Sequence, residues 1–185
     1  IWKAILFRIG IDNYKTCLAH ISVPEIVYEQ SKKFIPSEKY VVLCPEASNR
    51  NRSIDIDKCE EIISYLINNY PEYDIVVSTD CRDPNYSDQI QALIQKYNMV
   101  DFMGKTTLDQ FIVLVSHASM LVGCDSGGIH LAASLGIPSI CLKGYWDKPH
   151  FLPYVFEKQC EKDKIPIVLY PSPVPRCAFC GDEGR

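Results

Sequence analysis

Short apolar runs alternate along the chain with longer segments whose apolar residues recur at helical spacing. The apolar runs predict four β-strands, at residues 40–44, 74–78, 120–124 and 139–142. The helical spacing predicts helices at residues 57–69, 86–97 and 129–135, and one that begins at Thr107. Thr107 has Gln110 three positions on, which is a capping-box pattern. Strands that are apolar throughout are typical of a sheet covered on both faces, so the pattern predicts an α/β domain with a doubly wound parallel sheet.

Composition places the chain among ordinary soluble globular proteins. Its 185 residues are 47% hydrophobic and 23% charged, and the formal net charge is −4. An acidic balance argues against nonspecific nucleic-acid binding, which rests on a basic surface. No apolar run approaches the roughly 18 residues of a membrane span. The nine cysteines are odd in number and scattered, which predicts reduced thiols in a cytoplasmic protein.

The loops after the predicted strands hold the candidate chemistry, because ligands of parallel α/β sheets bind outside the carboxyl ends of the strands. The strongest signal is a strand followed by Asp125, Ser126, Gly127 and Gly128, and then by a helix. Such a turn lets backbone N–H groups and the helix dipole meet an anion, and glycines leave room for a phosphate. A tight turn in which Asp125 or Ser126 only caps the helix fits the same spacing. The residues alone leave both interpretations open.

Three linked motifs resemble glycosyltransferase family nine, the heptosyltransferases and their relatives. They lie at residues 41–48 (VVLCPEAS), 104–108 (GKTTL) and 116–138 (SHASMLVGCDSGGIHLAASLGIP). The resemblance covers roughly residues 40–154 and implies one half of a GT-B fold, the C-terminal half that binds the donor. It implies a nucleotide-sugar donor such as ADP-heptose, and no further cofactor. The catalytic base of the family belongs to the acceptor half, so we expect no catalytic residue in this chain.

The resemblance assigns the donor diphosphate to the glycine-rich turn. The family positions that hold it correspond here to Ser126, Gly127, Gly128 and His130. Asp125 corresponds to the acid that contacts the donor sugar. A leaving diphosphate would be stabilised here by a helix N-terminus, hydroxyls and a cation, which implies a mechanism without a metal.

Further donor contacts are implied by the loops after the other strands. Ser48 and Arg52 correspond to a hydroxyl and a lysine that contact the diphosphate and sugar, and Thr106 to a residue whose backbone touches adenine. Asp80 stands near the place of the family acid after the second strand. Lys143, at the end of the fourth strand, is a second candidate cation after Arg52.

Two departures from the family pattern keep other functions open. Glu46 stands where a glycine is usual, and residues 52–55 (RSID) replace a lysine-arginine-tryptophan-proline run. Arginine keeps the charge of lysine but not its geometry. The alternatives are a nucleotide-sugar epimerase on the same two-domain plan and a degenerate domain kept for protein contacts.

The resemblance also sets the expected domain boundaries. Residues 1–39 form a lead-in segment from a preceding acceptor domain, with a strand at 4–7 and a helix at 25–34. Residues 40–154 form the donor-binding domain, and 155–185 a tail or return segment. Because the chain begins at Ile1 rather than Met, we interpret it as part of a longer protein.

Partners and a weaker metal signal complete the expectations. The partners are a nucleotide-sugar and, through the preceding domain, a saccharide, lipid-linked or protein acceptor. We expect no transmembrane segment and a cytoplasmic location, either free or peripheral at the inner face of the membrane. Cys177 and Cys180 form a C-x-x-C pair with Cys160 upstream, but a structural metal needs about four ligands. No metal site is therefore expected, and a truncated metal finger, which some relatives of the family carry near the C-terminus, is the alternative.

Overall fold

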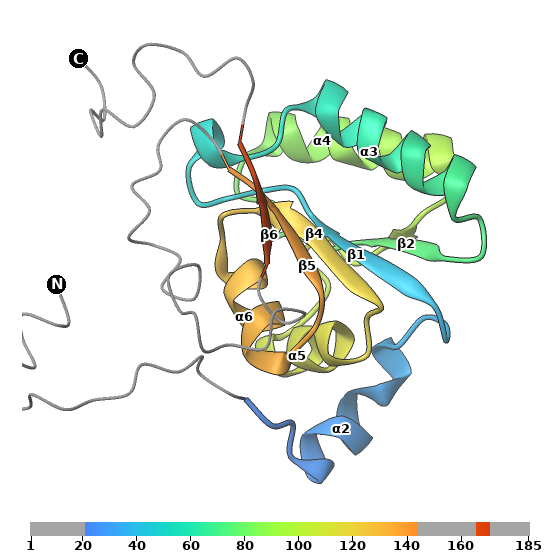
Figure 1. The fold of residues 1–185 in the computed structure, drawn as a ribbon, viewed down its shortest axis with the longest axis vertical. Helices are drawn as coiled ribbons and strands as arrows, with labels where there is room; N and C mark the ends of the chain where they lie inside the picture. Colours follow the sequence, from blue (N-terminus) through green and yellow to red (C-terminus); the bar gives the residue numbers. More distant parts are fainter. Residues whose placement is uncertain (1–20, 144–165, 171–185) are drawn as a thin grey trace, which may run out of the picture.

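Parallel strands form the centre of the molecule in a computed structural model that describes residues 21–143 and 166–170 (Figure 1). The described strands make one six-stranded sheet in the order β3-β2-β1-β4-β5-β6, and every neighbouring pair is parallel. Their bounds are Tyr40–Cys44 (β1), Asp74–Val77 (β2), Val100–Asp101 (β3), Met120–Cys124 (β4), Ser139–Leu142 (β5) and Ile167–Leu169 (β6). The order reverses direction between β1 and β4, which is the switch point of a doubly wound sheet.

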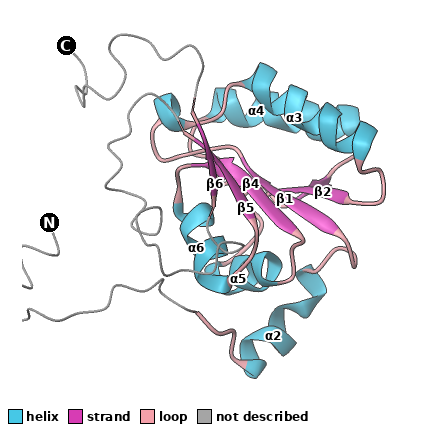
Figure 2. Ribbon diagram, viewed as in Figure 1, coloured by secondary structure: helices cyan, strands magenta, loops and turns pink. Residues whose placement is uncertain are grey.

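Helices cover both faces of this sheet (Figure 2). One face carries α3 and α4, and the other carries α5 and α6. The helix bounds are Ile56–Asn69 (α3), Pro84–Tyr97 (α4), Leu108–Ser116 (α5) and Gly127–Leu135 (α6). Apolar side chains alternate along β1 between two buried clusters, one beneath each helix layer. All five residues of β1 are buried, which explains why this strand is apolar without a break.

A short helix before the sheet packs on the α5 side. This helix, α2 (Glu25–Ser31), continues into a 3₁₀ turn, η1 (Lys32–Phe34). The ring of Tyr28 stacks on His117, the C-cap of α5, with 5.1 Å between ring centroids. The predicted helix at 25–34 therefore exists but is divided into two parts. The predicted strand at 4–7 lies outside the described residues.

The predicted strands and helices within the described ranges are confirmed, with small shifts at their ends. Two strands were not predicted: β3 has two residues and β6 has three, too few to show a periodicity. Strand β6 pairs with β5 and comes from the segment expected to be a tail or return segment. It therefore extends the sheet with residues beyond position 154.

None of the helices in the described ranges is long and apolar enough to cross a membrane.

The capping box predicted at Thr107 is present at the start of α5. The Thr107 hydroxyl accepts from the N–H of Gln110 at 3.3 Å, and the Gln110 side chain accepts from the N–H of Thr107 at 2.8 Å. Both bonds satisfy donors that a helix start leaves unpaired.

Candidate functional site

A cavity of about 1020 Å³ opens at the carboxyl ends of the strands. Its walls come from the loops after β1, β2, β3 and β4, so it lies across the switch point of the sheet. The cavity brings together nine of the ten residues predicted for the site. These are Ser48, Arg52, Asp80, Thr106, Asp125, Ser126, Gly127, Gly128 and His130.

The N-terminus of α6 faces this cavity directly after β4. Only Asp125 and Ser126 separate the end of the strand at Cys124 from the first helical residue, Gly127. Ser126 is the N-cap with an extended backbone, and its side chain makes no capping hydrogen bond. A Cβ placed on Gly127 would meet no atom of the described residues within 4 Å. The start of α6 thus offers backbone N–H groups and the positive end of a helix dipole to an open space, as anion sites do.

Gly128, the next residue, lies close to the sheet. A Cβ at this position would lie 3.3 Å from Sγ of Cys44 on β1 and 3.7 Å from Cδ1 of Leu121 on β4. The missing side chain would therefore point at β1 and β4, and its absence lets α6 pack closely on these two central strands. Gly128 also lines the cavity, so its contact with a phosphate stays a prediction.

A third glycine, which the sequence analysis did not single out, fixes the spacing of the central strands. A Cβ on Gly123 of β4 would lie 2.8 Å from the carbonyl oxygen of Cys44 on β1. That separation is far below van der Waals contact and involves backbone, which cannot swing aside. Gly123 is paired with Cys44 in the β1–β4 register. A glycine is therefore required at the strand pair that carries the switch point.

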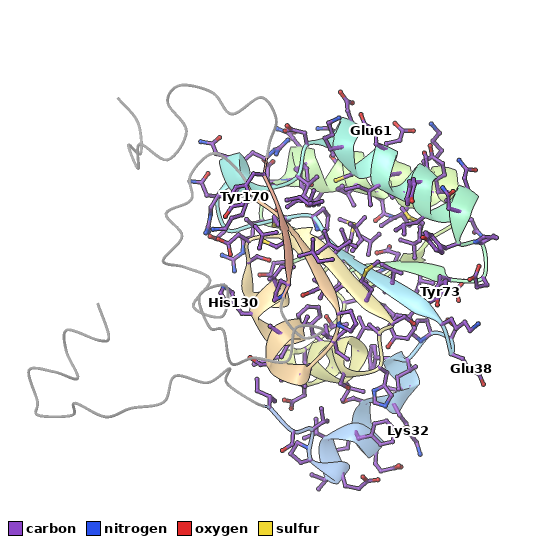
Figure 3. The ribbon with its side chains drawn as sticks, viewed as in Figure 1. Lys32, Glu38, Glu61, Tyr73, His130 and Tyr170 are labelled. Carbon is purple, nitrogen blue, oxygen red and sulfur yellow. The ribbon has the colours of Figure 1, made fainter. Side chains whose placement is uncertain are left out.

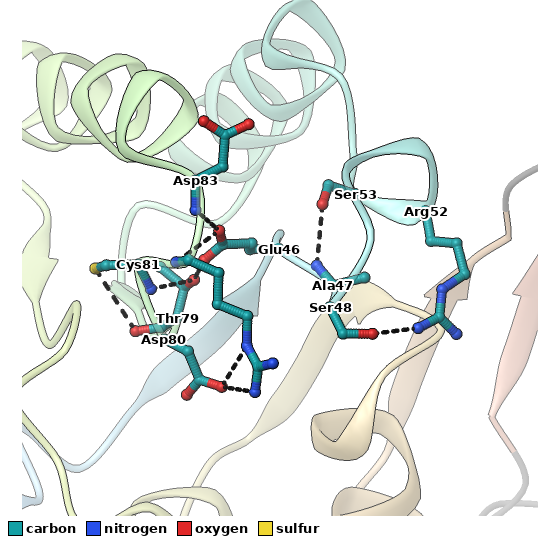
Figure 4. A network of polar contacts seen from close by, with 10 residues as sticks. Glu46, Ala47, Ser48, Arg52, Ser53, Thr79, Asp80, Cys81 and Asp83 are labelled. Carbon is teal, nitrogen blue, oxygen red and sulfur yellow. Dashed lines mark hydrogen bonds and ion pairs between the residues drawn. The ribbon is translucent and has the colours of Figure 1, made fainter.

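The loop after β1 presents a cation to the cavity. Arg52 closes a 3₁₀ turn, η2 (Arg50–Arg52), and its Nη2 donates to the Ser48 hydroxyl at 2.6 Å (Figure 4). The N–H of Ala47 donates to Oγ of Ser53 at 3.0 Å and closes the loop on itself. This loop places the hydroxyl and guanidinium of its two predicted site residues side by side.

A buried tyrosine anchors the same loop to α4. The Tyr86 hydroxyl donates to the carbonyl of Ile54 at 2.7 Å, and the Arg50 guanidinium carbon lies 4.4 Å from the centre of its ring. Burial raises the pKa of Tyr86 well above its ordinary value, so the hydroxyl remains a donor. Arg50 is thus used in packing, whereas Arg52, two residues on, is left to face the cavity.

Glu46, the departure from the family glycine, ties two of the cavity loops together. Its carboxylate accepts the backbone N–H groups of Arg82 at 3.0 Å and Asp83 at 2.9 Å, and also the hydroxyl of Thr79 (Figure 4). Asp83 is the N-cap of α4, so the carboxylate also sits at the positive end of that helix. Glu46 therefore holds the loop after β2 against the loop after β1.

The acid at the end of β2 is paired on the surface. One Asp80 carboxylate oxygen lies 2.9 Å from Nη2 of Arg82, and both side chains are largely exposed. Arg82 also lines the cavity, although it was not predicted as a site residue. Its place in the loop after β2 was the available signal, because that loop opens on the cavity edge.

Asp125 lies between two basic side chains, of which only one lines the cavity. Its carboxylate is 6% exposed, with Oδ1 3.6 Å from Nε2 of His130 and Oδ2 3.7 Å from Nζ of Lys143. His130 projects from α6 (Figure 3) and is 41% exposed, whereas the Lys143 side chain is fully buried. Lys143 is absent from the residues that line the cavity. Lys143, predicted as a second candidate cation, is therefore the one predicted site residue that the cavity lining does not include.

The cysteines of the described ranges are free thiols. Burial raises the pKa of Cys59 and Cys124 to about 11, and that of Cys44 further, so these thiols are unreactive at neutral pH. Among the described residues, no group of three or more side chains is placed to hold a metal ion. Cys160, Cys177 and Cys180 lie outside those residues.

The strand order, the cavity at the switch point and the glycine-rich start of α6 define a Rossmann-like doubly wound domain. Residues 6–163 match the family model of glycosyltransferase family 9 (heptosyltransferase), and the chain belongs to this family. The family resemblance noted in the sequence is thereby confirmed.

Individual relatives are similar at low identity. The chain is 26% identical over 155 residues to lipopolysaccharide heptosyltransferase 3 of Escherichia coli K12, covering 82% of this chain and 45% of that protein. The solved family 9 glycosyltransferase of Veillonella parvula aligns with a TM-score of 0.70 at 18% identity, over 91% of this chain and 47% of that one. The E. coli ADP-heptose lipopolysaccharide heptosyltransferase II aligns with a TM-score of 0.64 at 22% identity, over 88% and 50%. The chain thus spans about half the length of these relatives and shares their fold.

Proposed function

We propose that this chain is the donor-binding half of a glycosyltransferase. The transferred sugar is a heptose, carried by a nucleoside diphosphate such as ADP, and the acceptor is lipopolysaccharide or a protein. The observation that carries the proposal is the start of α6, where Gly127 opens onto the cavity. Membership of family 9 supports heptose as the sugar, and the relatives include heptosyltransferases that are named for ADP-heptose or lipopolysaccharide.

The diphosphate is assigned to the space between α6 and the loop after β1. Backbone N–H groups at Gly127 and the Ser126 hydroxyl approach it from one side, and Arg52 and Ser48 from the other. As the bond from the sugar to the diphosphate breaks, negative charge grows on the leaving phosphate. The helix dipole and the guanidinium stabilise that charge without rearranging. The proposed chemistry therefore needs no metal ion.

The nucleoside is assigned to the wall built by the loop after β3 and the start of α5. Thr106, Leu108 and Phe111 line the cavity there. The Leu108 side chain is largely exposed, since the residue as a whole is 71% accessible. A planar base gains from covering such apolar surface, while backbone groups at Thr106 supply polar contacts to its edge. The catalytic base, the side chain that takes a proton from the acceptor, is a different group. It is expected from the half that precedes this domain in the family.

A thermal-shift titration with ADP, UDP, GDP and CDP tests the proposal. At ten times Kd, a ligand stabilises by about 1.4 kcal/mol, which raises the Tm of a chain of this size by roughly 3 °C. We expect a shift with ADP alone, and its loss in Gly127→Val, whose side chain would fill the open space at the start of α6. Gly127→Ala serves as a graded partner.

Two other results would redirect the assignment. A shift with UDP alone would contradict an ADP-sugar donor and favour the epimerase or another donor class. Absence of a shift with all four nucleotides at millimolar concentration would contradict donor binding by this chain and favour a domain kept for protein contacts.

A further inference from the structure

A buried acid lines the cavity next to the proposed diphosphate position. Asp125 precedes Ser126, the N-cap of α6, and its carboxylate is 6% exposed. A negative charge at this point favours the helix start but repels a bound diphosphate. Because the carboxylate is removed from water, solvent and salt screen that repulsion poorly. Some other group must therefore offset the charge of Asp125 for the cavity to accept an anion.

Lys143 is placed to do this from the neighbouring strand. It follows β5, whose last residue is paired with the last residue of β4, so the two strand ends lie next to each other. Its Nζ lies 3.7 Å from Oδ2 of Asp125, and its side chain has no exposed surface. A buried ammonium is tolerated only beside a compensating charge. The other carboxylate oxygen, Oδ1, lies 3.6 Å from Nε2 of His130, which lines the cavity.

We propose that Lys143 is a positioning residue that neutralises Asp125 beneath the donor diphosphate, without touching the ligand. The proposal rests on the proposed function, because it takes the ligand to be a nucleoside diphosphate. It divides the two predicted cations by role. Arg52 acts on the ligand from the cavity wall, and Lys143, which does not line the cavity, acts through the carboxylate of Asp125.

Calorimetric titration of the full 185-residue chain with ADP and with adenosine at pH 8 separates these roles. ADP contains no sugar beyond its ribose, so contacts of Asp125 with a donor sugar do not enter. In Lys143→Met, we expect ADP to bind about tenfold more weakly, because the Asp125 carboxylate near the phosphates loses the charge of Lys143. Binding of adenosine, which has no charge, should change by less than about twofold.

The rescue experiment carries the proposal. In Lys143→Met combined with Asp125→Asn, both charges are gone, and we expect ADP affinity to return to within about threefold of the unmodified chain. Arg52→Met is the matched control. It should weaken ADP binding as well, but Asp125→Asn should not restore that loss, because Arg52 contacts the ligand itself.

Three outcomes would overturn the proposal. The first is unchanged ADP affinity in Lys143→Met, and the second is a double variant as weak as Lys143→Met, which would make Lys143 a direct ligand contact. The third concerns melting temperatures, which can be measured even where a variant folds too poorly for a binding titration. Lys143→Met should melt lower and the double variant should recover much of that loss, whereas additive losses would refute the pairing. If the unmodified chain does not bind ADP, the proposed function fails, and the melting cycle still decides whether the pair exists.

Discussion

At the scale of single residues, three glycines around the switch point have different structural roles. Gly127 faces open space, Gly128 faces the side chains of Cys44 and Leu121, and Gly123 faces a backbone oxygen. The same residue type thus serves ligand access, helix packing and strand spacing within six positions of the chain.

This division predicts unequal effects on stability when one methyl group is added at Gly123 or at Gly127. Gly123→Ala should lower the free energy of unfolding by about 1–3 kcal/mol, because the new Cβ meets an oxygen that cannot move away. Gly127→Ala should change it by less than about 0.5 kcal/mol, because its Cβ meets no neighbour. Urea unfolding of the two variants checks this. Equal effects at the two positions would contradict the assignment.

The sequence predicted that Gly127 and Gly128 form a turn at a helix start, but not which way each one faces. The motif reports spacing along the chain, whereas the direction of a missing side chain depends on the strand packed beside it. Lys143 illustrates the same limit. Its position after a strand predicted a residue at the cavity edge, but its burial against Asp125 depends on how β5 lies beside β4.

At the scale of elements, the loop after β2 depends on one acid from another loop. Glu46→Gly would restore the residue usual in the family and remove an acceptor for two backbone N–H groups and one hydroxyl. We expect it to lower the free energy of unfolding by about 1–3 kcal/mol, the cost of leaving such donors without their partner.

Thermal unfolding measures the effect of Glu46→Gly. Glu61→Gly is not a suitable control, because glycine inside α3 destabilises the helix by itself. Glu46→Gln is the better partner, since it keeps one acceptor oxygen in place. It should lose less stability than Glu46→Gly. Equal melting temperatures for Glu46→Gly and the unmodified chain would show that the tie is dispensable.

Local elements were predictable where their signal lies within a few residues. The capping box of Thr107 and Gln110 could be read from the sequence because its partners are three positions apart. The tie made by Glu46 could not, because its partners lie 33 to 37 positions away. Strands β3 and β6 were missed because two or three residues show no period, and only pairing with β2 and β5 defines them.

At the scale of the whole molecule, the buried thiols make stability fall at alkaline pH. The pKa of Cys59 and Cys124 is raised from 9.0 to about 11 by burial. The folded chain therefore keeps protons that the unfolded chain releases. The stabilisation is fully present below about pH 9 and is lost as pH rises towards 11.

Urea unfolding in reducing buffer at pH 7.5 and pH 10 measures this loss. In the double variant Cys59→Ala and Cys124→Ala, we expect a smaller fall in the free energy of unfolding between the two pH values. The smaller side chains lower stability at both pH values alike, so the difference isolates the thiols. An unchanged fall would show that other groups are responsible.

The sheet consists of two halves, each formed by one continuous stretch of the sequence. Strands β1 to β3 lie within residues 40–101, and β4 to β6 within 120–169, so β1 and β4 meet as the ends of two separate halves. The cavity has one wall on each half. Neither half alone forms the cavity, and a ligand bound in it would contact both halves. A ligand in this cavity would therefore bind only chains in which both halves are folded together, and its binding would stabilise that joined form over partly folded ones.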